Sequence, residues 1–148
     1  MKICKVRDVK TPERGTSLSA GFDFFVPNDW PGETCLLPGE DVNIGSGIHV
    51  QVPHGYMLAA FNKSGVALRK GLQVGATVVD EDYQGEVHLH VRNISNDLQT
   101  IKPGEKLVQM ILIPVSYEGV EVLDSLGDLY PEGETERGEG RFGSTGTE

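Results

Sequence analysis

The chain has 148 residues, a formal net charge of −9 at pH 7 and two cysteines. This length suits one domain with its own core. The acidic balance argues against DNA or RNA as a partner, because non-specific binding of nucleic acid needs a basic surface. Cys4 and Cys35 follow no metal-ligand spacing and form no disulfide framework, which favours a reducing compartment. No apolar run is typical of a secretory signal or a membrane span. We therefore expect a cytoplasmic protein, or one of the host cytoplasm if the source is viral, without a membrane partner.

Hydrophobic residues recur with a period of two, which is typical of β-strands. Residues 86–92 alternate, with valine and leucine on one face and charged or histidine side chains on the other. In residues 42–52 the apolar side chains also share one parity, and Gly45 and Gly47 mark expected bulges or kinks. Residues 107–115 form a longer apolar run, which predicts a strand covered on both faces. Many short strands separated by turn residues favour an antiparallel sandwich or barrel.

The last residues differ from the rest of the chain in composition. Residues 127–148 are rich in glycine and carboxylates, so they bury too little apolar surface to offset the entropy of ordering. We therefore predict a β-rich core over 1–126 and a flexible arm over 127–148. Within the arm, residues 137–146 combine glycine, arginine and hydroxyl side chains, a composition that suits phosphate. An arm that becomes ordered only on an anionic ligand is the alternative to permanent disorder.

One segment, Ser64–Leu72, breaks the strand pattern and predicts a short helix. Ser64 is the expected N-cap and Gly71 the expected C-cap. A helix N-terminus offers free N–H groups to a phosphate, and Lys63 adds a positive charge at that point. The simpler interpretation is that Ser64 only caps the helix.

Several polar residues lie in or beside the predicted strands. Asp80 closes an apolar run and Tyr83 follows it three residues later, so the first can hold a water as a base and the second can pack on a sugar. Ordinary turn chemistry is the common alternative. His88 and His90 share one strand face and could chelate a metal, but two exposed histidines are the simpler interpretation without a third ligand. Gln109 is either a buried amide bonded to backbone or a donor into a pocket.

Five segments in this order resemble the five motifs of the trimeric dUTPases. They are Ala20–Asp23 (AGFD), Lys63–Gly65 (KSG), Gly75–Gly85 (GATVVDEDYQG), Gly104–Gln109 (GEKLVQ) and Arg137–Gly146 (RGEGRFGSTG). The third and fifth segments are specific, and the resemblance spans nearly the whole chain. The sequence departs from the family pattern at Lys63, where arginine is usual, and at Arg141, where glycine is usual. The stretch 126–136 is also longer than is typical.

The resemblance implies an all-β fold: a distorted jelly-roll-like β-barrel with one short helix and a flexible Gly-rich C-terminal arm. It implies hydrolysis of dUTP to dUMP and pyrophosphate by attack of water on the α-phosphate, with Mg²⁺ as cofactor. This reaction keeps uracil out of DNA and supplies dUMP for thymidylate synthesis. The family is homotrimeric, so the resemblance also implies three active sites, each shared by three chains, with the arm closing over a neighbouring site.

Roles for single residues follow from the same resemblance. Asp80 would activate the attacking water, and Tyr83 would pack on the deoxyribose and exclude a 2′-hydroxyl. Asp23 would hold the magnesium shell through water, and Phe142 of the arm would stack on uracil. The other implied binding residues are the backbone of Gly75, Thr77, Val78 and Val79 at the uracil edge, Lys63, Ser64, Gly65 and Gln109 at the phosphates, and Arg137, Ser144 and Thr145 at the γ-phosphate, with Gly143 beside them.

Two other functions are compatible with the same fold. A dCTP deaminase shares it but needs a catalytic glutamate in a motif of its own, which this sequence does not contain. A trimeric barrel that binds dUTP for signalling, or serves as a structural viral component, would act without turnover. Asp80 and the arm favour turnover, and the released product, ammonia or pyrophosphate, distinguishes the two enzymes.

Overall fold

The computed structural model describes residues 1–133 and 135–140, and the chain divides into two units, Met1–Ser116 and Tyr117–Glu148. Every strand of the described residues lies in the first unit. In the second unit, α2 (Leu126–Leu129) is a single helical turn that the sequence reasoning missed. Its N-cap is Ser125, whose hydroxyl accepts a 3.1 Å hydrogen bond from the Asp128 amide. None of the helices in the described part of the chain is long and apolar enough to cross a membrane.

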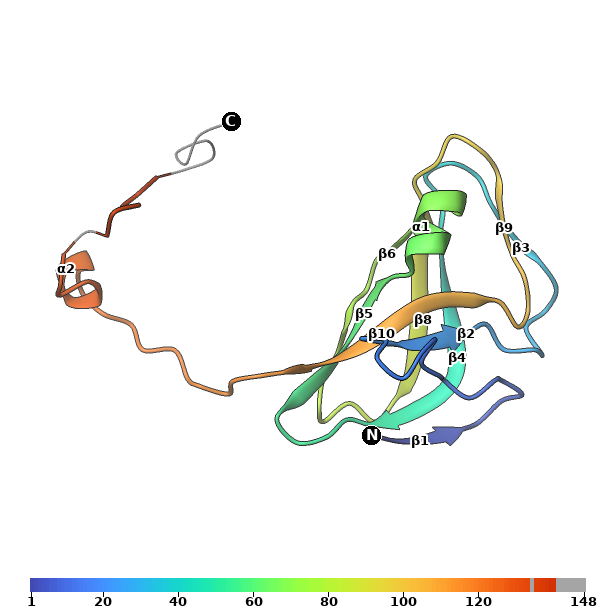
Figure 1. The fold of residues 1–148 in the computed structure, drawn as a ribbon, viewed down its shortest axis with the longest axis horizontal. Helices are drawn as coiled ribbons and strands as arrows, with labels where there is room; N and C mark the ends of the chain where they lie inside the picture. Colours follow the sequence, from blue (N-terminus) through green and yellow to red (C-terminus); the bar gives the residue numbers. More distant parts are fainter. Residues whose placement is uncertain (134, 141–148) are drawn as a thin grey trace. The chain divides into compact units, whose positions relative to one another are not determined.

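The first unit is built from antiparallel strands in three sheets (Figure 1). The first sheet has the order β1 (Lys2–Lys5), β4 (Asp41–Gln51), β8 (Glu86–Asn93) and β6 (Leu72–Val74). The second has the order β2 (Phe22–Phe25), β10 (Lys106–Pro114), β5 (Tyr56–Asn62) and β7 (Val78–Val79). A two-stranded sheet pairs β3 (Thr34–Leu36) with β9 (Gln99–Ile101). The prediction of an all-β fold is therefore confirmed.

One hydrophobic core holds the sheets together. In β8 the alternation buries Val87, Leu89 and Val91, as the period of two predicted. These side chains belong to the same buried cluster as Phe24 of β2 and Val108 of β10, so both four-stranded sheets contribute to it. Because the core fixes the sheets, the loops and strand ends that leave them have defined positions.

The expected distortion at the glycines of β4 is confirmed. The pairing of β4 with β8 shifts register between Gly45 and His49, and Gly47 has a φ of 71° that favours glycine. A β-carbon on Gly45 would lie 2.8 Å from the carboxylate of Glu86. That carboxylate instead accepts a 2.6 Å hydrogen bond from the amide of Gly47, which fixes the bulge.

Helix α1 (Ser64–Lys70) follows β5 and ends as predicted at Gly71, which has the left-handed conformation. The prediction that Ser64 is the N-cap was wrong. Lys63 holds that position with an extended backbone, and no side chain forms a capping hydrogen bond. The carbonyl of Lys63 accepts a 2.9 Å bond from the amide of Ala67, so the helix begins with the serine already inside its first turn.

Candidate functional site

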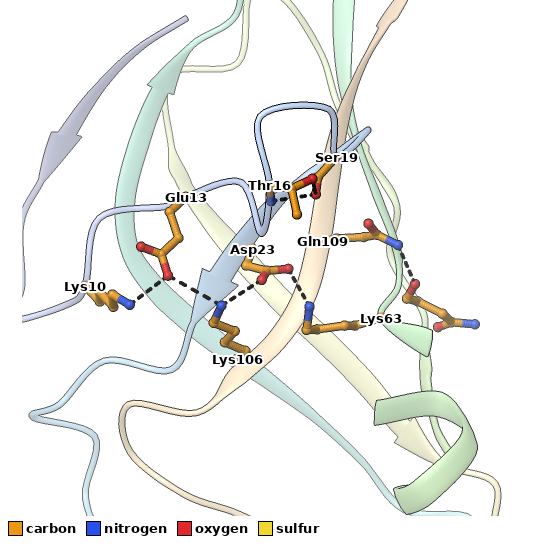
Figure 2. A network of polar contacts seen from close by, with 9 residues as sticks. Lys10, Glu13, Thr16, Ser19, Asp23, Lys63, Lys106 and Gln109 are labelled. Carbon is orange, nitrogen blue, oxygen red and sulfur yellow. Dashed lines mark hydrogen bonds and ion pairs between the residues drawn. The ribbon is translucent and has the colours of Figure 1, made fainter. Parts of the chain in front are cut away.

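A buried carboxylate, Asp23, lies between two lysines at one end of the second sheet (Figure 2). Its side chain is 6% exposed, and each oxygen accepts one hydrogen bond. Lys63 Nζ lies 2.8 Å from Oδ1, and Lys106 Nζ lies 3.0 Å from Oδ2. Lys106 also lies 3.4 Å from Glu13, which forms a 2.7 Å pair with Lys10. Three lysines therefore share two carboxylates here, which makes this corner locally positive in an acidic chain.

The pairing keeps these groups charged. Burial raises the pKa of Asp23, but the hydrogen bonds from Lys63 and Lys106 outweigh it and hold that pKa below its ordinary value. The hydrogen bond to Asp23 likewise raises the pKa of Lys106. Lys10 lowers the pKa of Glu13, mainly through its hydrogen bond. Sequence reasoning gave Lys106 no role, because a lysine at the start of a strand carries no distinguishing signal.

Gln109 lies beside this group. It is the direct cross-strand partner of Asp23 in the pairing of β10 with β2, so the first and fourth motifs meet. Its amide nitrogen donates a 2.9 Å bond to the carbonyl of Asn62, just ahead of Lys63 (Figure 2). Of the two interpretations left open by the sequence, the structure shows the backbone contact. Ser64 and Gly65 are exposed in the first turn of α1 and directly follow Lys63 in the chain.

The loop after β7 carries Asp80 and Tyr83. Asp80 is exposed directly after the strand. The hydroxyl of Tyr83 donates a 3.0 Å bond to the carbonyl of Glu86, and a β-carbon on Gly85 would overlap the tyrosine ring. The absence of a side chain on Gly85 therefore leaves room for the hydroxyl end of the ring, and Tyr83 lines a hollow of about 430 Å³ with residues 2–4 of β1.

A second carboxylate fixes this loop and was missed by sequence reasoning. Glu81 accepts a 2.8 Å bond from the Gly55 amide through one oxygen and lies 2.8 Å from His54 Nδ1 through the other. It therefore ties the loop to the turn that joins β4 to β5. Acidic residues in turns are common, so only the fold distinguishes Glu81 from Asp82, its exposed neighbour.

The two halves of the predicted site lie at opposite ends of β5. Lys63 follows the last residue of β5, whereas Val79 pairs with Leu58 near its beginning. Asp80 is the next residue beyond that pair. From the rise per residue of a β-strand, it lies roughly 20 Å from Lys63 along the direction of β5. In one chain the structure thus brings together Asp23, Lys63 and Gln109 but keeps Asp80 and Tyr83 away from them.

The edge strand β7 presents free backbone groups. The amide of Ala60 donates to the carbonyl of Thr77 at 2.7 Å, and Ala59 pairs with Val78. Because hydrogen-bonded pairs alternate along an antiparallel ladder, the N–H and C=O of Val78 face away from β5. Since β7 is the edge strand of its sheet, these groups have no strand partner in the described part of the chain. Thr77 and Val78 also border a hollow of about 290 Å³.

His90 was expected to be an exposed histidine, with metal binding as the alternative. The structure instead shows a side chain only 28% exposed, with hydrogen bonds to Ala76 and Asp41. His88 is exposed, and its Nδ1 lies 2.9 Å from the carbonyl of Glu86. Among residues 1–133 and 135–140, no cluster of three or more His, Cys, Asp or Glu side chains could hold a metal ion.

Of the arm residues predicted to bind the substrate, Arg137 is among the described residues. Arg137 Nε donates a long 3.5 Å bond to the carbonyl of Gly140 within the arm. Phe142, Gly143, Ser144 and Thr145 lie outside the described residues. Their proposed contacts with uracil and γ-phosphate stay predictions.

Comparison with known proteins decides the family. The model of the dUTPase family matches residues 7–146. The mouse (Mus musculus) deoxyuridine 5′-triphosphate nucleotidohydrolase is 35% identical over 135 residues, which cover 91% of this chain and 77% of that protein. The enzyme of the same name from Bdellovibrio bacteriovorus is 39% identical over 130 residues, covering 86% of this chain and 82% of that protein. The chain belongs to the dUTPase family.

Solved structures agree with the dUTPase fold. A mutant dUTPase of Staphylococcus bacteriophage 80alpha with dUpNHpp superposes with a TM-score of 0.82 at 22% identity, covering 99% of this chain and 98% of that one. A mutant dUTPase from phage phi11 of S. aureus, which coordinates a structural Mg(II) ion, gives a TM-score of 0.73 at 19% identity, covering 85% and 97%. At these identities the likeness establishes the fold. As a dUTPase family member, this chain is a nucleotide hydrolase.

Proposed function

We propose that the chain hydrolyses dUTP to dUMP and pyrophosphate by attack of a water molecule on the α-phosphate, with Asp80 as the base that orients and activates that water. The observation that carries the proposal is the position of Asp80 in this dUTPase chain. It is exposed at the end of the edge strand β7, beside free backbone groups and the fixed ring of Tyr83. A strand-end carboxylate with this exposure can accept the proton that water loses during attack.

The separation of Asp80 from Lys63 supports a site shared between chains. Neither side chain spans the roughly 20 Å between the two ends of β5. A second copy that places its own phosphate-binding corner against the Asp80 loop completes the set, and closed symmetry repeats the arrangement in every copy. We therefore propose a homotrimer with three active sites, in which the arm of a third chain closes each site.

Recognition of the nucleoside falls to the third motif. The N–H and C=O of Val78, one donor and one acceptor, match the edge of uracil, and the backbone of Thr77 lies directly before them. The backbone of Gly75 and Val79 borders this edge. Tyr83 packs on the deoxyribose, where its ring leaves no room for a 2′-hydroxyl.

Recognition of the phosphates falls to the corner that contains Asp23 (Figure 2). Lys63 supplies charge, and the exposed Ser64 and Gly65 supply hydroxyl and N–H donors. The side-chain amide of Gln109 lies beside this corner and contributes to the same phosphate site. The remaining contacts come from the arm, where Phe142 stacks on uracil and Arg137, Gly143, Ser144 and Thr145 surround the γ-phosphate.

The donor set fits a magnesium ion that is carried by the substrate. Each oxygen of Asp23 accepts one hydrogen bond and retains a lone pair, so it can accept another from a metal-bound water. Mg²⁺ keeps several waters and needs few protein ligands when phosphates bind it. When bound, the ion neutralises phosphate charge. Asp23 holds its water shell, and its pairing with two lysines keeps that carboxylate ionised.

We assign the activity to the cytoplasm, where removal of dUTP keeps uracil out of DNA and supplies dUMP. The decisive test measures pyrophosphate release from dUTP, dTTP, dCTP and UTP, with and without Mg²⁺. We expect turnover of dUTP alone, dependent on the metal. Release of ammonia from dCTP would instead identify a deaminase, and binding of dUTP without pyrophosphate release would identify a binding protein.

A further inference from the structure

The imidazole of His90 bridges two strands and the segment that follows β6. Its Nδ1 lies 3.0 Å from the amide nitrogen of Ala76, and its Nε2 lies 3.0 Å from Oδ2 of Asp41 on β4. A β-carbon on Gly75 would overlap this ring, so the imidazole rests directly on the Gly75 backbone. The main-chain carbonyl of His90 also accepts a 3.0 Å bond from the Gly75 amide.

These contacts specify the tautomer of the ring. A backbone amide only donates, so Nδ1 must be the unprotonated acceptor. The proton then sits on Nε2 and is donated to the carboxylate of Asp41. This is the arrangement by which a carboxylate orients a histidine for a task at its other nitrogen. Here that task is to hold the Ala76 amide.

Residues 75–77 depend on this support because they belong to no strand. Both amides donate to His90. The Gly75 N–H donates to its main-chain carbonyl, and the Ala76 N–H donates to Nδ1 of its ring. The next contact is the bond from the Ala60 amide to the carbonyl of Thr77. Between these two anchors the backbone turns from the first sheet into the second, and it sets the direction in which Val78 presents its free N–H and C=O groups.

We propose that His90, oriented by Asp41, is the positioning residue that sets base discrimination by holding the backbone of residues 75–78 in register with the pyrimidine edge. The inference rests on the proposed function, because it assumes that this edge reads the base. His90 contacts the backbone ahead of the base-reading edge and has no part in the proposed phosphate corner, so its loss should weaken binding and selectivity while the chemical step continues.

Two substitutions separate the two nitrogens of the ring. In His90→Asn the amide oxygen falls near the position of Nδ1, so it can still accept from Ala76 but cannot reach Asp41. In His90→Gln the terminal amide falls near Nε2, so it keeps the contact with Asp41 and loses the acceptor for Ala76. His88→Gln is the matched control, because His88 is exposed on the same strand face and, within the described part of the chain, its ring lies at hydrogen-bond distance from the Glu86 carbonyl rather than from residues 75–78.

The experiment measures kcat and KM for dUTP, and the inhibition constant of dCTP as a competitor of dUTP, in wild type and the three variants. We expect His90→Gln to raise KM for dUTP roughly fivefold to tenfold, the range for one lost hydrogen bond. Its kcat should stay within about twofold of wild type, and its preference for dUTP over dCTP should fall. His90→Asn keeps the bond from Ala76 but loses Asp41, so it should raise KM only about twofold to threefold, whereas His88→Gln should remain near wild type. Asp41→Ala, at a side chain that is 57% exposed, keeps the test available if His90→Gln does not fold, and it should raise KM about twofold to threefold.

Two results would overturn the inference. One is an unchanged KM and base preference in His90→Gln, or in Asp41→Ala if that variant must replace it. The other is equal impairment of His90→Asn and His90→Gln with matching losses of thermal stability, which would make the histidine a structural residue only. A wild-type protein that releases no pyrophosphate from dUTP would instead refute the proposed function, so the two failures are distinguishable.

Discussion

Lys63 and Asp80 lie at opposite ends of the same strand, since Lys63 directly follows β5 and the residue before Asp80 pairs with Leu58 near its start. Because this distance exceeds the reach of either side chain, we expect the lysine and the carboxylate that act on one substrate to come from different chains. This separation allows a test of site sharing in which Lys63 is substituted in one chain and Asp80 in another.

Co-expression of Lys63→Gln and Asp80→Asn chains should restore activity that neither variant has alone. In a mixed trimer with closed symmetry, about one site in three takes an intact Asp80 from one chain and an intact Lys63 from another. Turnover of co-purified, doubly tagged mixed trimers measures this. If each site used residues of one chain only, the mixture would be as inactive as its parents.

Asp80→Asn should keep the fold and bind dUTP but slow turnover at least about 100-fold, the lower range for loss of a general base. The side chain is exposed and the substitution preserves its shape, so thermal stability should not change. Calorimetric titration with dUTP and single-turnover pyrophosphate release are the measurements. Turnover close to wild type would remove Asp80 from the mechanism.

Tyr83→Ala should relax the preference for deoxyribose. The hydrogen bond to the Glu86 carbonyl holds the ring, and the absence of a side chain on Gly85 leaves room for it. Gly85→Ala should therefore displace the ring and have the same effect as Tyr83→Ala. We expect the ratio of kcat/KM for dUTP over UTP to fall about tenfold or more in both variants. Tyr83→Phe retains the ring and serves as control. An unchanged ratio in Tyr83→Ala would make this tyrosine a turn residue.

A chain that ends at Glu136 should remain trimeric and lose most dUTP turnover. Ordering about ten arm residues costs on the order of 10 kcal/mol of backbone entropy, which only contacts with uracil and the γ-phosphate can offset. Sedimentation velocity and pyrophosphate release test the two halves of this prediction. Full activity would refute the role of the arm, and dissociation would show that the arm holds the trimer together.

The acid stability of the protein should depend on Asp23. Its pKa in the folded chain lies below the ordinary value of 3.8, so its contribution to stability is present above that value and is lost as pH falls through the lowered pKa. Asp23→Asn should cost roughly 2 kcal/mol near neutral pH. The difference from wild type should shrink below about pH 4. Urea unfolding of both proteins at the same protein concentration, at pH 6 and at pH 3, measures this difference in the free energy of unfolding. A constant difference would mean that the charge of Asp23 contributes nothing.

The sequence by itself determined the class of fold and the identity of the motifs. The alternation at 86–92 predicted β8 because a strand that buries one face must place every second side chain in the core. Gly47 and Gly71 could be predicted for a similar reason, since few residues tolerate the left-handed backbone that these positions adopt. The family resemblance rested on the same kind of local pattern, and the family match confirmed it.

The tertiary structure alone decided which residues meet. Asp23, Lys63 and Lys106 are far apart in the sequence, and only the pairing of β2, β10 and β5 brings their charges within hydrogen-bonding distance. The same holds for His90, whose partners Asp41 and Ala76 lie on other elements, so an outward-facing histidine in a strand carried no sign of them. Periodicity reports the environment of one element, whereas a site is defined by contacts between elements, which depend on register and packing of the whole chain.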